Sequence, residues 1–180
     1  MRRVALGIGM LLLGYTPLYA EATEYQIKAA MLANFALFVE WPQAAFSTPD
    51  SPFVACVLGV DPFGPFLKHE LGERVGSHPV EIRYLEKAEA APECHIVFIS
   101  RSEEQRLKKV LTSLHNKSAL IVSDCSDIDE FCRDGGMIGF VMEGHKVRFD
   151  LNADAAAKAG LIIDSKLKRV TGSTECGEGR

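Results

Sequence analysis

Cysteines are the residues of this sequence best suited to covalent chemistry. Cys56 lies inside one apolar run, Cys94 directly precedes another, and Cys125 and Cys132 flank the hexapeptide SDIDEF. If the strands carrying Cys56 and Cys94 are neighbours, as in a flavodoxin-like order, their Cα atoms can come within the ~5–6 Å that a disulfide needs. Cys125 and Cys132 have the reach for a local disulfide, which would be either a structural staple or a more exposed redox sensor.

Other groups that could perform catalysis or bind a metal ion are scattered. Cys176 is left over near the C-terminus and would be a free thiol or an intermolecular bridge. The histidines form no HExxH pair, the cysteines no CxxC motif and the serines no GxSxG elbow. The acidic stretch 124–130 lacks the glycine and the closing glutamate of a calcium loop, which favours a solvated turn over a cation site. The sequence therefore predicts no catalytic residue, no metal site and no cofactor.

Composition and the N-terminus limit the remaining function classes. A 180-residue chain with 47% hydrophobic residues predicts one globular domain with a sizeable core. The net charge of -4, without a basic run interleaved with aromatic residues, argues against nucleic-acid binding. Arg2 and Arg3 precede an apolar stretch over 4–14, and small residues follow, which is the pattern of a cleavable signal peptide over 1–20. We therefore expect an exported protein in an oxidising compartment.

The elements that must position these residues alternate between strands and helices. Apolar runs predict strands at 53–60, 80–85, 95–100 and 119–123, and helical periodicity predicts helices at 25–40, 61–71, 102–114 and 153–159. This alternation predicts a compact α/β domain over 21–170, with a mixed, mostly parallel sheet and helices on both faces. The polar, glycine-rich stretch 171–180 is expected to be a disordered tail.

A β-hairpin is expected over residues 135–152, at the C-terminal side of this sheet. With Gly144-His145 as a two-residue loop, Phe140 faces Phe149 on a wholly apolar side. On the other side Glu143 faces Lys146, and Arg148 lies nearby, so this polar face carries charges of both signs. A Glu143-Gly144 loop would keep the same faces, so the sequence fixes the parity of the register better than the turn type.

Five sequence blocks, taken in order, resemble the YfiR family of periplasmic proteins. The resemblance covers nearly all of residues 25–170, and the blocks are NFALFVEWP (34–42), CVLGVDPFG (56–64), CHIVFISRSE (94–103), GGMIGFVMEGHKVRFDLN (135–152) and AGLIIDSKLKRV (159–170). It implies a compact α/β domain with two internal disulfides, which match Cys56–Cys94 and Cys125–Cys132.

The resemblance also implies a function. YfiR-type proteins are non-enzymatic repressors that bind the periplasmic domain of an inner-membrane diguanylate cyclase, YfiN, and lower cyclic-di-GMP synthesis. The residues matching those implicated in repression are Phe131, Glu143 and Phe149, beside which Lys146 and Arg148 complete the expected partner-binding face. The alternative is a small-ligand sensor that acts on a histidine kinase or a transporter, with its pocket at the carboxyl ends of the parallel strands. A homodimer is possible under either hypothesis.

Overall fold

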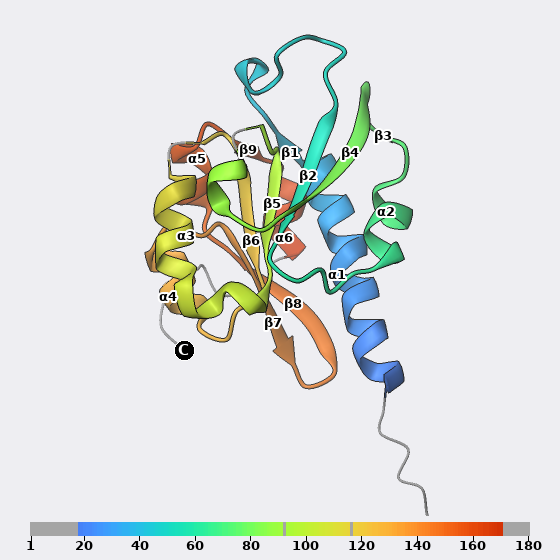
Figure 1. Cartoon of the computed structure of the whole chain (residues 1–180), viewed down its shortest axis with the longest axis vertical. Helices are drawn as coiled ribbons and strands as arrows, with labels where there is room; N and C mark the ends of the chain where they lie inside the picture. The colour runs from blue at the N-terminus through green and yellow to red at the C-terminus, as the bar shows by residue number, and fades with distance from the viewer. Residues whose placement is uncertain (1–17, 92, 116, 171–180) are drawn as a thin grey trace, which may run out of the picture.

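The computed structural model describes residues 18–91, 93–115 and 117–170 (Figure 1). Its helices are α1 (Leu18–Phe38), α2 (Pro65–Leu71), α3 (Leu107–Leu114), α4 (Ile128–Arg133), α5 (Ala153–Lys158) and α6 (Ser165–Val170), with 3-10 turns η1 (Gln43–Ala45), η2 (Ala88–Ala90) and η3 (Arg101–Arg106). Its strands are β1 (Val39–Glu40), β2 (Phe53–Leu58), β3 (Arg74–Val75), β4 (His78–Leu85), β5 (Ile96–Ile99), β6 (Leu120–Ser123), β7 (Ile138–Glu143), β8 (Lys146–Leu151) and β9 (Ile162–Ile163). The predicted tail, with Cys176, and most of the predicted signal peptide lie outside the described residues.

A seven-stranded sheet in the order β3-β4-β2-β5-β6-β7-β8 forms the centre of the molecule. The five strands from β4 to β7 are parallel, and β3 and β8 add antiparallel edges. The parallel part has the flavodoxin-like order, in which the first strand along the chain lies between the second and the third. The predicted mixed, mostly parallel α/β sheet is therefore confirmed.

Helices cover both faces of this sheet, with α1 and α2 on one side and α3 and α4 on the other (Figure 1). Every residue of β2, β5 and β6 is buried, which explains why these strands are apolar at consecutive positions instead of alternating. On the α1 side, Phe63 contacts Phe98 with ring centroids 4.6 Å apart. On the opposite side, Ile128 of α4 packs directly against Gly139 of β7.

The first helix ends two residues earlier than the sequence predicts. Val39 and Glu40 leave the helix and pair antiparallel with Ile163 and Ile162 of β9. The carbonyl of Phe38 accepts a hydrogen bond from the amide of Asp164 at 2.9 Å, so a distant segment satisfies the end of α1. Within the part of the chain that the structure describes, no helix combines the length and apolar character needed to cross a membrane.

Candidate protein-binding site

The β7–β8 hairpin has the predicted register. Met142 lies opposite Val147, Phe140 opposite Phe149, and Gly144-His145 forms the loop. Gly144 has φ of 60°, a conformation that glycine adopts without steric cost. The apolar side faces α1, where the Phe35 ring lies 5.9 Å from Phe140 and 5.0 Å from Phe149. The hairpin is thus fixed to the body through an aromatic cluster under α1.

The opposite side of the hairpin presents charged groups to solvent. Glu143, Lys146 and Arg148 are all exposed. Although Glu143 lies opposite Lys146 in the register, its carboxylate pairs with Arg148, at 3.5 Å between Oε2 and Nε. An exposed ion pair of this kind contributes roughly 0–1 kcal/mol to stability. The arrangement therefore suits recognition of a charged partner surface better than stabilisation of the fold.

Two residues expected on the partner-binding face lie in the core instead. Phe131 is 0% exposed and Phe149 is 3% exposed. Phe131 lies so close to Gly136 that a Cβ atom there would overlap its ring. Neither ring is available for direct contact with a partner. Phe131 lies in α4, next to the start of the hairpin, and Phe149 lies in β8, where it packs against Phe35 of α1.

A buried charge network, which sequence reasoning missed, joins α1 to the carboxyl end of β6. Asp124 accepts hydrogen bonds from the Tyr25 hydroxyl at 2.7 Å and from the Lys28 ammonium at 2.9 Å, both on Oδ2. Lys28 also pairs with Glu24 at 2.5 Å. The Arg101 guanidinium donates twice to the main-chain oxygen of Asp124, at 3.1 and 3.0 Å. The only signal in the sequence was a lysine at the apolar side of a helix.

The two charged groups at the centre of this network are almost completely shielded from water. The side chains of Lys28 and Asp124 are each 1% exposed, and Oδ1 of Asp124 is buried without a hydrogen-bond partner among the described residues. Burial, followed by the hydrogen bond to Asp124, raises the pKa of Tyr25 well above its ordinary value. The Lys28 ammonium also lies 5.8 Å from the centre of the Phe140 ring, within cation–π range. The network therefore fixes the N-terminal half of α1 to the carboxyl end of β6, beside Phe140 of the hairpin. The alternative hypothesis placed a ligand pocket at this end of the sheet.

The family of the chain follows from comparison with known proteins. The model of the YfiR/HmsC-like family matches residues 25–171. The chain belongs to this family. It is a regulatory, non-catalytic family of periplasmic proteins that act on diguanylate cyclases. No curated protein matches the chain.

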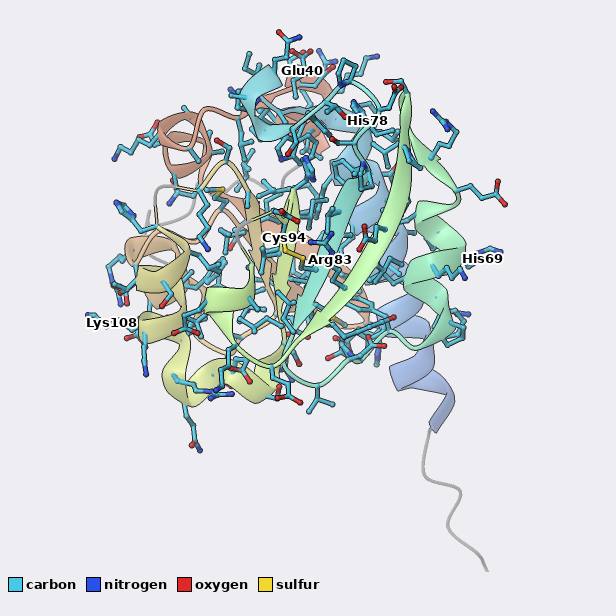
Figure 2. All side chains as sticks on the ribbon, turned by 45° about the horizontal axis from the view of Figure 1, so that its top comes forward. Glu40, His69, His78, Arg83, Cys94 and Lys108 are labelled. Carbon is cyan, nitrogen blue, oxygen red and sulfur yellow. A yellow bond between two sulfur atoms is a disulfide. The ribbon has the colours of Figure 1, made fainter. Side chains whose placement is uncertain are left out.

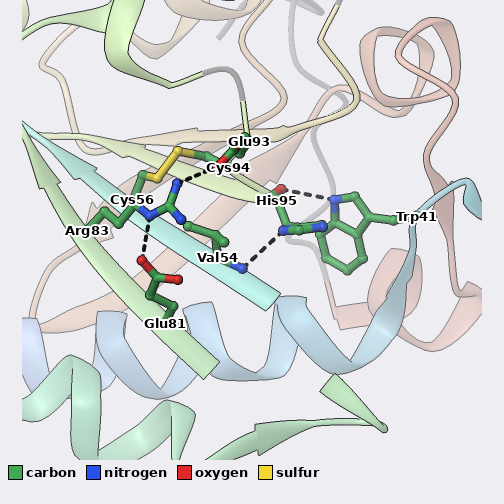
Figure 3. Close-up of a disulfide and its surroundings, with 8 residues drawn as sticks. All are labelled: Trp41, Val54, Cys56, Glu81, Arg83, Glu93, Cys94 and His95. Atoms are coloured by element: carbon green, nitrogen blue, oxygen red, sulfur yellow. Dashed lines mark hydrogen bonds and ion pairs between the residues drawn. A yellow bond between two sulfur atoms is a disulfide. The ribbon is translucent and has the colours of Figure 1, made fainter. Parts of the chain in front are cut away.

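One of the two disulfides implied by the YfiR resemblance is present in the structure. Cys56 of β2 is bonded to Cys94, with Cα atoms 5.9 Å apart, across the neighbouring strands β2 and β5 (Figures 2 and 3). Beside it, Arg83 forms ion pairs with Glu81 at 2.6 Å and with Glu93 at 3.0 Å. The disulfide therefore joins β2 to the segment before β5, and the ion pair between Arg83 and Glu93 joins β4 to the same segment.

The expected bond between Cys125 and Cys132 is not formed. Cys125 is a free, buried thiol, whereas Cys132 is part of a disulfide with a different cysteine. The segment between them, expected as a loop, is helix α4, capped by the Asp127 side chain, which accepts from the amide of Glu130 at 2.7 Å. Cys125 precedes this helix by three residues, and Cys132 lies in its last turn.

The free thiol is poorly suited to redox sensing. Burial raises the pKa of Cys125 to about 11, which outweighs the lowering effect of a hydrogen bond with Ser123. Since the thiolate is the reactive form, this sulfur is chemically quiet at neutral pH. The hypothesis of a redox-sensing bond between Cys125 and Cys132 is therefore wrong for this structure.

A cavity of about 330 Å³ lies between α3, α4 and α5, on the face opposite α1. Leu111, Leu114 and Met137 are among its apolar lining residues, and Lys117 and Lys158 are among its basic ones. Its size and charge suit a small anionic molecule. Among the described residues no cluster of three or more His, Cys, Asp or Glu side chains could hold a metal ion.

Proposed function

We propose that this protein binds the periplasmic domain of an inner-membrane diguanylate cyclase and represses it, lowering cyclic-di-GMP output. Membership of the YfiR/HmsC-like family supports the class of partner. The exposed face formed by Glu143, Lys146 and Arg148 supports the place of contact. A face that carries charges of both signs is suited to a selective protein contact, because the charges set register and association rate.

The packing of the hairpin against the rest of the protein supports its role as an inhibitory surface. Phe140 and Phe149 are clamped by Phe35 of α1, and α4 supports the other side of β7 through Ile128. A preorganised surface loses little conformational entropy on binding. Phe131 and Phe149 then matter for repression because they position the charged face, without touching the partner.

Charge reversal on the hairpin tests the proposal. The ligand in this experiment is the purified periplasmic domain of an inner-membrane diguanylate cyclase from the same organism. The variant Lys146→Glu/Arg148→Glu is expected to weaken binding at least about tenfold and to lose much of its salt dependence. The matched control is Lys108→Glu/Lys109→Glu, which makes the same change of charge on α3. Equal affinities of the two variants, or no binding by the wild-type protein, would contradict the proposal.

A second candidate function is favoured by the basic cavity between α3, α4 and α5. It is that of a sensor for a small anionic ligand, acting on a histidine kinase or a transporter. A thermal-shift screen with nucleotides and carboxylates tests it, and Lys117→Ala/Lys158→Ala should abolish any stabilisation found. Ligand-induced stabilisation with no binding to the cyclase domain would favour this second function over the first.

A further inference from the structure

The segment Pro42–Pro52, between β1 and β2, is held to the body by two histidine rings. None of its residues is buried. The ring of Phe46 is stacked on His78 of β4, with centroids 3.9 Å apart, and on His95, with centroids 4.3 Å apart. Nδ1 of His78 forms a hydrogen bond with the carbonyl of Ser51 at 2.8 Å. The segment thus depends on aromatic and polar contacts with two histidine side chains.

His95 is bonded in a way that requires a neutral ring. It is 4% exposed, and its Nδ1 accepts a hydrogen bond from the amide of Val54 at 3.0 Å (Figure 3). A proton on Nδ1 would turn this acceptor into a donor that faces another donor. Nε2 is buried without a hydrogen-bond partner among the described residues, and the contact with the main chain of Ala45 favours the protonated ring less than burial disfavours it. Protonation of the buried ring is therefore incompatible with its present contacts.

We propose that Phe46 and His95 form an acid-sensitive clasp, in which protonation of His95 releases Phe46 and the segment Pro42–Pro52 leaves the amino ends of the strands. The main chain of His95 stays in place. Its amide donates to Val54 at 2.8 Å, its carbonyl accepts from Leu120 at 2.8 Å, and the neighbouring Cys94 is covalently bound to Cys56. The opening is thus confined to the segment and the ring, and the sheet remains intact.

The surroundings of His95 also disfavour the protonated ring while the segment is closed. Burial lowers its pKa to about 4, a weaker contact with the main chain of Ala45 raises it, and positive charge on His78 and Arg83 lowers it further. Phe46, Phe53 and Trp41, which surround the ring, carry no charge.

The acidic groups nearby do not compensate for this positive charge. Glu81 and Glu93 are bonded to Arg83, which leaves them unavailable to His95. The remaining acidic side chain in the segment itself is Asp50, which is exposed.

The sign of the pH dependence follows from the lowered pKa. A histidine released into water titrates near 6.5, and the buried ring titrates near 4, so the open form binds protons more readily. The closed form has its full stability above pH 6.5 and loses it progressively as the pH falls toward 4. The ratio of open to closed protein is expected to rise about 30-fold between pH 7.5 and pH 5, and about 300-fold once the pH is well below 4.

Trp41 is the single tryptophan of the chain and reports on this site directly. Its indole donates to the carbonyl of His95 at 2.9 Å, and its ring lies 5.0 Å from Phe53. Fluorescence excited at the tryptophan band, recorded from pH 8 to pH 3.5 with acrylamide quenching, should show a red shift and easier quenching between pH 6.5 and 4. Far-UV circular dichroism should remain constant over the same range.

Three variants make the test decisive. His95→Asn keeps an acceptor near the Nδ1 position but cannot titrate, so the transition should disappear. His69→Asn, at an exposed histidine of α2, should leave the transition unchanged (Figure 2). Phe46→Ala, which removes a half-buried ring, should make Trp41 accessible already at pH 7.5 and leave no transition to observe. A shift that coincides with loss of circular dichroism, or one that persists in His95→Asn with the same midpoint, would overturn the proposal.

Discussion

The buried pair of Lys28 and Asp124 offers the most informative perturbation of the fold. Lys28→Met keeps most of the side-chain volume but removes the ammonium that lies 2.9 Å from Asp124 and 2.5 Å from Glu24. Glu24 is 24% exposed and can turn to water, whereas Asp124 is 1% exposed and cannot. The substitution therefore leaves a buried carboxylate with the Tyr25 hydroxyl as its remaining donor among the described residues. Breaking a buried pair in this way costs about 3–5 kcal/mol of unfolding free energy.

The reverse substitution should cost less. Asp124→Asn removes the carboxylate but leaves Lys28 paired with Glu24, so the ammonium retains a counter-charge. We expect a loss of about 2 kcal/mol, mainly from the weakened hydrogen bonds of Tyr25 and Lys28. In the double variant no uncompensated charge stays buried at position 124. Its loss should be smaller than the sum of the single losses by at least about 2 kcal/mol.

Urea unfolding at pH 7.5, followed by circular dichroism with the Cys56–Cys94 disulfide intact, measures these three free energies. Hydrogen exchange of the Phe140 and Phe149 amides provides a local readout, because the network fixes α1 over the hairpin. Faster exchange there should accompany the global loss in Lys28→Met. Losses that add within about 0.5 kcal/mol, or a larger loss in Asp124→Asn than in Lys28→Met, would refute the reasoning.

Three further predictions concern packing and the cysteines. Gly139→Ala places a methyl group 2.5 Å from Cγ2 of Ile128 and should cost about 1–3 kcal/mol in urea unfolding, and Ile128→Ala in the same chain should recover part of this loss; no recovery would mean that the clash lies elsewhere. Replacing Cys56 and Cys94 by serine should remove about 4 kcal/mol of unfolding free energy, as expected for a closed loop of this length. Cys125, with a pKa near 11 and only 4% of its surface exposed, should react with a thiol reagent at pH 8 only after urea unfolding, and rapid labelling of the native protein would contradict its burial.

Patterns along the chain were sufficient for most of the architecture. The apolar runs of β2, β5 and β6 are buried on both faces, as continuous hydrophobicity implies. The hairpin register followed from the alternation around Gly144, because a one-residue slip would have exposed Phe140 and Phe149. The Cys56–Cys94 bond was within reach once the strand order was right. These features are local, or follow from rules of strand order, and for that reason the sequence carried them.

Interactions between distant segments were decided by the tertiary structure alone. Asp124 and Lys28 are 96 residues apart, and only the packing of α1 on the sheet joins them in a water-free site. The segment between Cys125 and Cys132, expected as a loop, is helix α4, and Cys125 remains a free thiol. The family resemblance placed Phe131 and Phe149 at the partner-binding face, but both are buried, Phe131 in α4 and Phe149 on the side of the hairpin that packs against Phe35 of α1. The periodicity of apolar residues along the chain determines which side chains are buried. Which charged groups and thiols meet in the interior depends on how the helices are placed on the two faces of the sheet.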